Sequence, residues 1–396
     1  QIRYGVLAAC EYDPEFLVQG AQGSRRVVGA GSDYGVARVL FEDQPGGAYK
    51  SFGLLSTMVL NKAGDALVQS LDGHYLGENG KFKADAQVFT SDKDGVDRGF
   101  GGFVDFEYAF RQGVTQRLGI EYFDDAVDVS DLGFLQRNDN FRIRQAHTRT
   151  RSDLSWARSN QLDVRGFVQK NAEDLFTQGG LFISNQSVLN NLSQVVLRLD
   201  LLAASYDDLN SFGNGTYRVE ARQMASVGWA SNRSKPLSLG GKLGYQGEEL
   251  GGDSYVYSLY ATWRPDDRLV LDVMLNYLDR SAWLLHSRDR TMSTFDAEQW
   301  APGIGLEYFI SAKQQLKFVV QWVGVKARAR GAYGILDAPG HLQRRPDLDA
   351  SVPDFAVSQV SLQGRYRWEI APLSDLFVVY TRQSNQSGLL LQRDFQ

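Results

Sequence analysis

The stretch 103–110 alternates between two kinds of side chain. Apolar residues occupy every second position, namely Val104, Phe106, Tyr108 and Phe110. Asp105 and Glu107 lie between them, and a period of two predicts a β-strand whose successive side chains point to opposite faces. Runs of this kind last about nine to thirteen residues here, whereas strands of soluble proteins usually have about five or six. Since a tilted strand needs about nine to eleven residues to cross a bilayer, the pattern indicates a transmembrane β-barrel.

Such runs cover nearly the whole chain, so the predicted fold class is all-β: a transmembrane antiparallel barrel of about 18–20 strands. The predicted strands are 2–10, 34–43, 50–60, 64–76, 81–91, 99–111, 115–124, 140–150, 160–171, 178–187, 192–205, 216–229, 237–246, 253–264, 267–281, 299–310, 313–328, 356–370 and 375–384. No linker, low-complexity tract or fixed repeat interrupts them, so residues 1–396 are predicted to form one domain. Residues 386–396 are predicted to be an external loop. A closing strand is expected after residue 396 or before residue 1, unless the strand list divides one segment wrongly.

The predicted links between strands alternate between short and long. The short ones are 371–374, 311–312, 265–266 and the turn at Gly113. The long ones are 329–355, 282–298, 125–139 and 11–33. Because outer-membrane barrels have short periplasmic turns and longer external loops, this alternation predicts that the short links face the periplasm.

Large aromatic residues stand at the strand ends next to the short links. They are Phe110, Trp229, Trp263, Tyr366 and Trp368. Rings with an apolar body and a polar edge favour the boundary between membrane and water. We therefore predict that these five residues lie at a membrane interface, although aromatic residues are common in strands of any kind.

Composition narrows the alternatives without deciding between them. The 396 residues are 43% hydrophobic, with a net charge of -5 and a mean hydropathy of -0.31. No apolar run approaches the roughly 18 residues that a spanning helix needs. A barrel exposes only half of each strand to lipid, so average values of this kind suit it. A large soluble all-β binding protein stays an alternative, and the mild acidity gives no reason to expect a nucleic-acid partner.

If the apolar faces meet lipid, the opposite faces line the interior of the barrel. The predicted lumen-lining residues are Asp105, Glu107, Asp163, Arg165, Arg198, Asp200, Arg218, Glu220, Arg222, Asp272, Lys317, Arg365 and Arg367. One interpretation is a network of cross-strand ion pairs that braces a wide barrel. The other is a polar pathway whose charges select solutes by sign. The two are compatible, since a barrel of this size is wide enough for water unless a loop or another polypeptide fills it.

Three segments resemble a known family. Residues 129–139 read VSDLGFLQRND, residues 4–9 read YGVLAA, and residues 365–382 read RYRWEIAPLSDLFVVYTR. These segments are similar to parts of an uncharacterised family of bacterial outer-membrane proteins, in which a carbohydrate-binding family-9-like domain precedes a β-barrel. The resemblance implies that this chain is the barrel portion and that its location is the bacterial outer membrane. It implies no reaction and no substrate.

The sequence offers little evidence of a reaction, and we expect no catalytic residues, no metal and no cofactor. A catalytic histidine needs a nucleophile and an orienting group, but His286 and Ser287 would point to opposite faces of a strand. The acidic segments 124–128 and 347–349 carry oxygen ligands that calcium accepts, yet they lack EF-hand spacing. The single Cys10 excludes a disulfide within the chain and a multi-cysteine metal site.

These observations lead to a non-enzymatic outer-membrane barrel that acts as a channel or export conduit with a polar lumen of mixed charge. The alternative is a scaffold barrel within a larger envelope complex, with a plugged lumen. A weaker alternative is an outer-membrane hydrolase that uses His286 or His147. The expected partners are outer-membrane lipid and periplasmic or external proteins.

Overall fold

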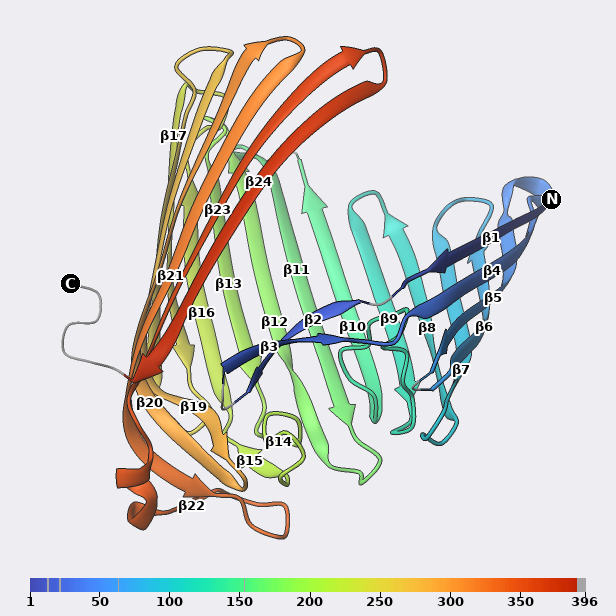
Figure 1. The fold of residues 1–396 in the computed structure, drawn as a ribbon. Coiled ribbons are helices and arrows are strands. Elements are labelled where there is room, and N and C mark those ends of the chain that lie inside the picture. Colours follow the sequence, from blue (N-terminus) through green and yellow to red (C-terminus); the bar gives the residue numbers. More distant parts are fainter. Residues whose placement is uncertain (13, 21–22, 63, 153, 390–396) are drawn as a thin grey trace. The chain divides into compact units, whose positions relative to one another are not determined.

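A computed structural model describes residues 1–12, 14–20, 23–62, 64–152 and 154–389. Almost all of the regular structure is antiparallel β-sheet, and the two 3-10 helices are short (η1, Pro45–Gly47; η2, Pro346–Ser351). The chain forms two compact units (Figure 1). Unit 1 contains Gln1–Arg149 and Arg165–Phe176, and unit 2 contains Thr150–Val164 and Thr177–Gln396. In the described residues, no helix is long and apolar enough to cross a membrane.

Unit 1 is an up-and-down sheet in which each strand pairs antiparallel with the next. Its strands are, in order, β1 (Ile2–Cys10), β4 (Ser32–Asp43), β5 (Tyr49–Asn61), β6 (Ala66–Leu76), β7 (Phe82–Lys93), β8 (Gly99–Arg111), β9 (Val114–Phe123) and β10 (Asn140–Arg151). The next strand, β11 (Ala157–Lys170), has residues in both units. Each strand of this sheet was predicted to within three residues at both ends, and β1 was predicted at its observed bounds.

Unit 2 repeats this arrangement, and its later strands are longer than those of unit 1. Its sheet consists of β12 (Phe176–Leu189), β13 (Gln194–Leu202), β16 (Arg222–Ala230), β17 (Leu237–Gly247), β18 (Asp253–Trp263), β19 (Leu269–Arg288), β20 (Thr291–Ser311), β21 (Gln314–Gly334), β23 (Phe355–Ala371) and β24 (Ser374–Leu389). A separate two-stranded piece consists of β14 (Ser205–Asp207) and β15 (Tyr217–Val219). The short β22 (Gln343–Arg344) belongs to the main sheet and pairs with the end of β21. The predicted antiparallel all-β architecture is therefore confirmed, whereas one closed barrel domain over 1–396 stays a prediction.

The links show the predicted asymmetry only in part. At one edge of each sheet every link is short, namely 44–48, 77–81 and 112–113 in unit 1 and 190–193, 231–236, 264–268, 312–313 and 372–373 in unit 2. In the tightest of these, Gly113 has a φ of 75°, a conformation that glycine adopts without steric cost. The opposite edges carry the long links 11–31, 124–139, 203–221 and 335–354, but also short ones such as 62–65 and 94–98. The predicted alternation of short and long links therefore holds at one edge and only in part at the other.

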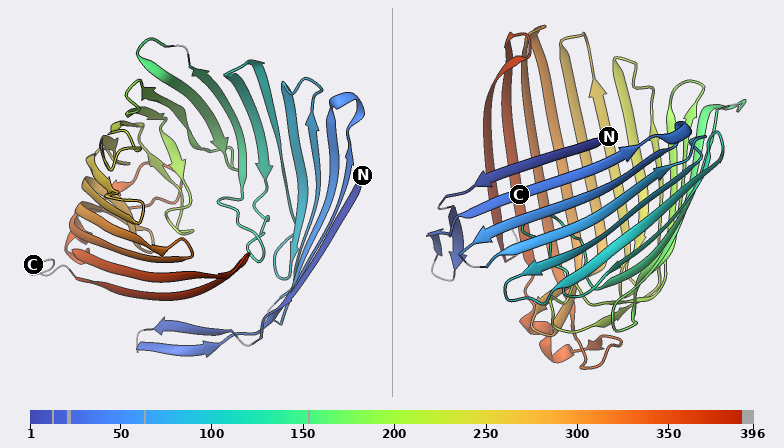
Figure 2. Two further views of the ribbon diagram at one scale, coloured as in Figure 1. Left: turned by 90° about the horizontal axis from the view of Figure 1, so that it is seen from above. Right: turned by 90° about the vertical axis from the view of Figure 1, so that its right-hand side faces the viewer.

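Several predicted loops are strands. The predicted link 282–298 is wrong because β19 and β20 continue through it to a turn at 289–290. β21 likewise extends to Gly334, into the predicted link 329–355. The predicted link 11–33 contains a hairpin of β2 (Glu15–Gly20) and β3 (Gly23–Val28), which Figure 2 shows in dark blue beyond the ends of β1 and β4. The predicted loop 386–396 begins inside β24, and its residues 390–396 lie outside the described part of the chain.

Two small cores explain why the strands of unit 2 are so long. Phe295, Ala297, Val325 and Ala327 are buried together, and Trp283 and Phe355 pack against them. A second buried cluster contains Tyr217, Val219, Leu284, Met292 and Ile335. This packing stabilises the extended ends of β19, β20 and β21, which were predicted to be loops.

The second cluster also corrects a strand prediction. The predicted strand 216–229 is divided into β15 and β16, and Glu220 and Ala221 lie between them outside any strand. Tyr217 and Val219, which the alternation places on the lipid-facing side, are instead 1% and 4% exposed. Burial raises the pKa of the Tyr217 hydroxyl above its ordinary value. β15 and β16 both alternate every two residues, so the sequence reads as one strand. The pattern does not show that β15 pairs with β14 and lies outside the main sheet.

Candidate functional site

The strand register places side chains of one kind in rows on each face of the sheets. In unit 1, Phe106 lies opposite Ala84 on one side and Leu118 on the other. The neighbouring position, Asp105, lies opposite Asp85 and Gly119. Because directly opposite residues of an antiparallel pair share a face, each sheet has an apolar face and a polar face. This is the division that the sequence predicts.

The apolar faces are unusually exposed. Examples from unit 1 are Leu71, Val88, Phe106 and Leu118, and from unit 2 Leu199, Val227, Leu243, Leu259, Val273, Ile304 and Phe318, all of which are more than a third exposed. Apolar surface in water costs about 25 cal/mol per Å², and soluble monomers rarely expose contiguous apolar patches of more than a few hundred Å². The faces defined by these rows therefore match a hydrocarbon solvent better than water.

The aromatic residues predicted from the sequence lie on the apolar faces next to the short links. In unit 1, Phe110 is 53% exposed and makes an edge-to-face contact with Tyr108, with ring centroids 4.9 Å apart. In unit 2, Trp229, Trp263 and Trp368 are 47%, 45% and 40% exposed. Tyr366 and Trp368 lie two positions apart on β23, opposite Leu316 and Gln314. We name these aromatic residues the first row.

A second aromatic row near the opposite edge of unit 2 was missed. Tyr257, Tyr277 and Trp300 lie side by side on β18, β19 and β20, with ring centroids 6.0 Å and 4.3 Å apart. Tyr245 and Tyr255 continue the row at 5.9 Å. The sequence shows these tyrosines at apolar positions of the alternating pattern. Only the strand register shows that they lie side by side on neighbouring strands.

The distance between the two rows fits a membrane. On β20, Trp300 and Tyr308 share the apolar face at the two ends of this segment. Eight residues at about 3.3 Å each separate them by about 26 Å along the strand. A strand tilt of about 40° reduces this to about 20 Å along a membrane normal, close to the apolar band of about 25 Å on outer-membrane barrels.

Beyond the second row the same face becomes charged. Glu298 is the next residue of β20 on that face after Trp300, and it lies opposite Asp279 on β19 and Lys326 on β21. One step further, Asp296 lies opposite Arg328. The change from tyrosine and tryptophan to acidic and basic residues within one step marks a boundary between an apolar and an aqueous environment.

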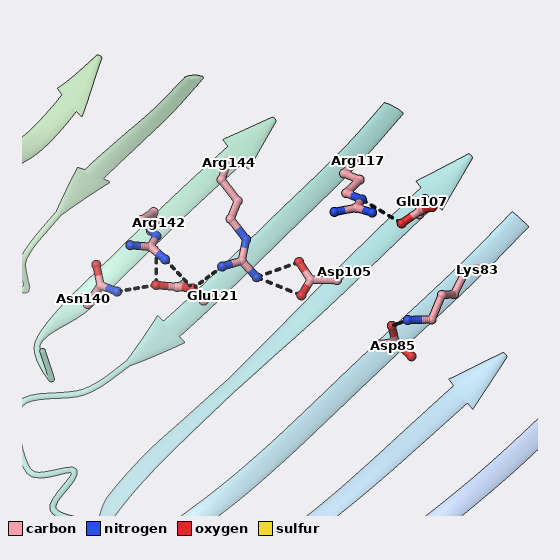
Figure 3. A network of polar contacts seen from close by, with 9 residues as sticks. All are labelled: Lys83, Asp85, Asp105, Glu107, Arg117, Glu121, Asn140, Arg142 and Arg144. Carbon is pink, nitrogen blue, oxygen red and sulfur yellow. Dashed lines mark hydrogen bonds and ion pairs between the residues drawn. The ribbon is translucent and has the colours of Figure 1, made fainter. Parts of the chain in front are cut away.

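The polar face of unit 1 carries a connected network of ion pairs (Figure 3). Arg144 on β10 donates two hydrogen bonds of 2.8 Å to the Asp105 carboxylate on β8, and its Nη1 lies 3.4 Å from Glu121 on β9. Glu121 is only 9% exposed, and it also accepts from Asn140 at 2.8 Å and pairs with Arg142 at 3.0 Å. The network therefore joins three neighbouring strands.

A glycine between Asp105 and Arg144 makes this bridge possible. Gly119 lies directly opposite both residues, in the middle strand. A Cβ atom there would overlap the Asp105 carboxylate and the Arg144 side chain. The same device recurs at Gly53, where a Cβ would lie 2.6 Å from the Asp72 carboxylate that pairs with Arg38. In both places the missing side chain lets an arginine reach across a strand.

We expect Gly119→Ala to lower the free energy of unfolding by about 1 kcal/mol, because the new methyl group displaces a packed ion pair. Urea unfolding followed by tryptophan fluorescence measures this loss. In an Asp105→Ala background the same Gly119→Ala change is expected to cost less, since half of the obstruction has gone. An equal cost in both backgrounds would contradict the bridge.

A second group of ion pairs on the polar face of unit 1 surrounds His74 on β6. His74 Nδ1 lies 2.7 Å from Asp85, and His74 Nε2 lies 3.1 Å from Asp72, which is 6% exposed. Lys83 pairs with Asp85 at 2.6 Å, and Arg38 pairs with Asp72 at 2.8 Å. A cavity of about 580 Å³ opens among these residues.

Further on, Arg117 pairs with Glu107 at 2.7 Å. Of the network residues in unit 1, the sequence singled out Asp105 and Glu107 as lumen-lining. It missed Arg38, Asp72, His74, Lys83, Asp85, Arg117, Glu121, Arg142 and Arg144. These residues could have been found from the sequence, because they occupy every second position on the polar side of their strands.

The predicted polar residues of unit 2 are more scattered. Arg198 and Asp200 lie on β13, and Asp272 on β19 accepts a 2.5 Å hydrogen bond from the Thr262 hydroxyl. Lys317, Arg365 and Arg367 form a group on β21 and β23. On β11, Asp163 falls in unit 2 and Arg165 in unit 1.

Three predicted lumen residues lie at or beyond the end of the sheet. Arg218 lies on β15, where its guanidinium is 5.9 Å from the Tyr206 ring centroid. Glu220 lies in no strand, and its carboxylate is 3.3 Å from His341 Nδ1. Arg222 begins β16 and pairs with Glu249 at 2.8 Å. The structure therefore leaves Arg218 and Glu220 outside the rows with Arg198 and Asp272, whereas Arg222 lies at the end of β16 on the same face as Arg198.

The acidic loop residues considered for calcium already have partners within the chain. Asp128 accepts hydrogen bonds from the Ser130 hydroxyl and backbone at 2.5 and 2.9 Å, and Lys93 lies at 3.0 Å. These contacts hold the pKa of the Asp128 carboxyl at about 2. Asp349 pairs with Arg344 and Asp347 with Arg345, and hydrogen bonds from these arginines lower the pKa of both carboxyls. No group of three histidine, cysteine or acidic side chains suited to a metal is found in the described residues.

The lowered pKa of Asp128 predicts a pH-dependent contribution to stability. A carboxyl whose pKa falls on folding stabilises the fold above its unfolded pKa of about 4, and this contribution is lost as pH falls towards about 2. We therefore expect Asp128→Asn to be less stable than the wild type from pH 7 to about pH 5, and the difference to vanish near pH 2. Chemical unfolding across this pH range measures it, and a difference that does not change with pH would contradict the assignment.

The two histidines considered for hydrolysis have different surroundings. His286 Nε2 lies 2.6 Å from the backbone carbonyl of Asp289, and its ring contacts Phe212. The neighbouring Ser287 hydroxyl donates to Ser293 instead. His147 lies on β10 opposite Gln116. No described contact joins either histidine to a serine hydroxyl.

Comparison with known proteins gives a family and a distant likeness to solved structures. A family model described as "Domain of unknown function (DUF5916)" matches residues 43–396. Among solved structures, the chain is similar to the anion-selective porin from Comamonas acidovorans, with 12% identity and a TM-score of 0.31. That alignment covers 92% of this chain and 99% of the porin chain. No curated protein sequence matches this chain.

Proposed function

The chain belongs to the DUF5916 family, and we propose that it forms an outer-membrane β-barrel that acts as a channel or export conduit. The observation that supports this most is the separation of the two faces of each sheet. The exposed apolar rows fit a bilayer, and in unit 2 an aromatic row lies near each edge. The opposite faces carry ion pairs. We also propose that the chain is the barrel portion of the outer-membrane family that its 129–139 motif resembles.

The energetics of lipid strengthen this proposal. An arginine or lysine at the midplane of a barrel's lipid face costs about 2–4 kcal/mol, and a slip of one residue exchanges the two faces of a strand. Charged residues of the polar faces, such as Asp105, Asp272 and Lys317, would then meet hydrocarbon. A shifted register would therefore cost several kcal/mol in a membrane, whereas exposing the same charges to water would cost little.

The polar face then lines the lumen and has two compatible roles. In unit 1 its charges are paired across strands, which braces the wall. In unit 2 residues such as Arg198 and Arg365 have no hydrogen-bond or ion-pair partner in the described part of the chain and are free to meet solutes. We propose that the protein is not an enzyme, because the contacts of His286 and His147 supply no nucleophile.

Conductance tests the channel directly. Purified protein refolded in detergent and added to a planar bilayer is expected to give discrete conductance steps, because a barrel of about 18–20 strands encloses an aqueous pore. Heat-denatured protein and empty detergent serve as controls. A folded, inserted protein that stays electrically silent would contradict an open channel.

The scaffold alternative rests on a different observation. The long loops display large apolar residues, with Phe134 89% exposed and Phe212 77% exposed. Phe134 lies in a loop that Asp128, Ser130 and Lys93 hold in place, so the ring is displayed on a structured surface. If the barrel holds envelope partners through these loops, mild native purification yields a larger complex, and Phe134→Ser weakens it. Recovery of the lone chain under those conditions would count against the scaffold.

A further inference from the structure

Two cationic side chains stand directly opposite each other on the polar face of unit 2. The register pairs Lys317 on β21 with Arg365 on β23. Arg367 follows two residues later on the same face, opposite Gln315. Like charges directly opposite each other destabilise an antiparallel pair. A sheet retains such a pair where something else compensates for it.

The acidic residues nearby compensate only part of this charge. Lys317 Nζ is 3.9 Å from Glu307, which also accepts a hydrogen bond from Gln315. Arg367 is held by both oxygens of Asp375, at 3.0 and 3.1 Å. Arg365 has no hydrogen bond or ion pair with any described residue. Glu369, two residues beyond Arg367 on the same face, lies opposite Asp375. Three acidic side chains therefore face the three cations, but none of them contacts Arg365.

The polar face of unit 1 shows that the chain can neutralise such residues. Six of its cations each contact a carboxylate at 3.2 Å or less, namely Arg38, His74, Lys83, Arg117, Arg142 and Arg144. Arg198 of unit 2 also has no such partner, but it lies opposite Ser184 and Ser226. The direct opposition of two cations is therefore what distinguishes Lys317 and Arg365. It is the feature expected where a ligand supplies the missing negative charge.

Neutral hydrogen-bonding side chains continue from the cationic group along the same face. Gln363 lies two residues before Arg365 on β23, opposite Thr381 on β24. Ser361 lies two residues before Gln363, opposite Gln321 on β21. No acidic residue interrupts these positions. We name Lys317, Arg365 and Gln363 the anion subsite.

We propose that the anion subsite binds the phosphate or carboxylate group of an anionic solute. Arginine presents a planar fork that matches the oxygens of either group, and lysine adds a point charge. Amide and hydroxyl groups beside them suit a solute whose remaining part is polar. This inference rests on the proposed channel, in which the polar face is open to passing solutes.

Inorganic phosphate is the probe, and thermal unfolding in detergent is the measurement. Phosphate is compared with chloride at equal ionic strength, so that general screening is the same in both. A ligand that binds only the folded state raises the melting temperature, and we expect a rise of about 2 °C or more for the wild type at saturating phosphate. Arg365→Gln is expected to abolish this rise and, in chloride, to raise the melting temperature itself by removing the opposed charges.

Two further variants make the result specific. Arg198→Gln removes a cation from the same face of unit 2 that lies opposite Ser184 and Ser226, and it is expected to keep the phosphate effect. Arg365→Lys keeps the charge without the fork and is expected to keep part of it. The subsite is wrong if phosphate has no effect on the wild type, or if Arg365→Gln and Lys317→Gln respond to phosphate as the wild type does.

The same variants in a bilayer separate this inference from the proposed function. Conductance that persists in Arg365→Gln with unchanged anion preference overturns the subsite and leaves the channel. A phosphate-dependent melting temperature in a protein that never conducts overturns the channel and leaves the subsite.

Discussion

Val273→Arg is expected to prevent most of the protein from assembling, whereas Met274→Arg is expected to assemble almost normally. The two residues are neighbours on β19 and both are 41% exposed. Val273 lies on the apolar face opposite Ile304, halfway between the aromatic rows, and Met274 lies on the polar face opposite Gly303. An arginine at the lipid midplane costs about 2–4 kcal/mol, while one in a water-filled lumen costs little.

The measurement for this pair is refolding into lipid vesicles, followed by the different gel mobility of folded and heated barrels. Val273→Leu is the control for a change that keeps the position apolar. In a soluble protein the two arginine variants would behave alike, since their exposed fractions are equal. Equal refolding of both variants would therefore overturn the membrane assignment as a whole.

Arg144→Ala is expected to lower the free energy of unfolding by about 2–3 kcal/mol, because it leaves carboxylates without their charged partner. Asp105 loses both of its hydrogen bonds, and the nearly buried Glu121 keeps only Arg142 and Asn140. Urea unfolding of the refolded protein measures the loss. It should be reduced at low pH, where the two carboxylates become neutral.

Arg117→Ala is the matched control for this prediction. It removes the same side chain from the same face, but Arg117 is 66% exposed and pairs with Glu107 alone. Exposed pairs contribute about 0–1 kcal/mol, so a loss of less than about 1 kcal/mol is expected. If both variants lose the same free energy, the bridge across Gly119 has no special role.

Much of the fold could be predicted from the sequence. Alternation located the strands, because a strand with one buried or lipid-facing side must repeat every two residues. It also placed Asp105 and Glu107 on the face opposite Phe106 and Tyr108. It failed where a strand has partners on both faces, as at Phe295 and Met292, because two-sided burial removes the period.

From the sequence we could predict which face of each strand is polar, but not which charged residues form ion pairs. Asp105 was identified, but its partner Arg144 is distant in sequence and Gly119 has no side chain to attract notice. Ion pairs depend on register, and no single strand reveals its register. The unpaired charge of Arg365 was invisible for the same reason, since Lys317 becomes its neighbour only when β21 and β23 align.

The amino-acid sequence by itself determined the strands, their two faces and the aromatic residues at one edge, because these follow from a local period of two. The tertiary structure alone decided which charges neutralise each other, where the second aromatic row lies and which strands extend beyond it. These features depend on residues brought together from different strands, and that alignment results from packing and backbone pairing over the whole sheet.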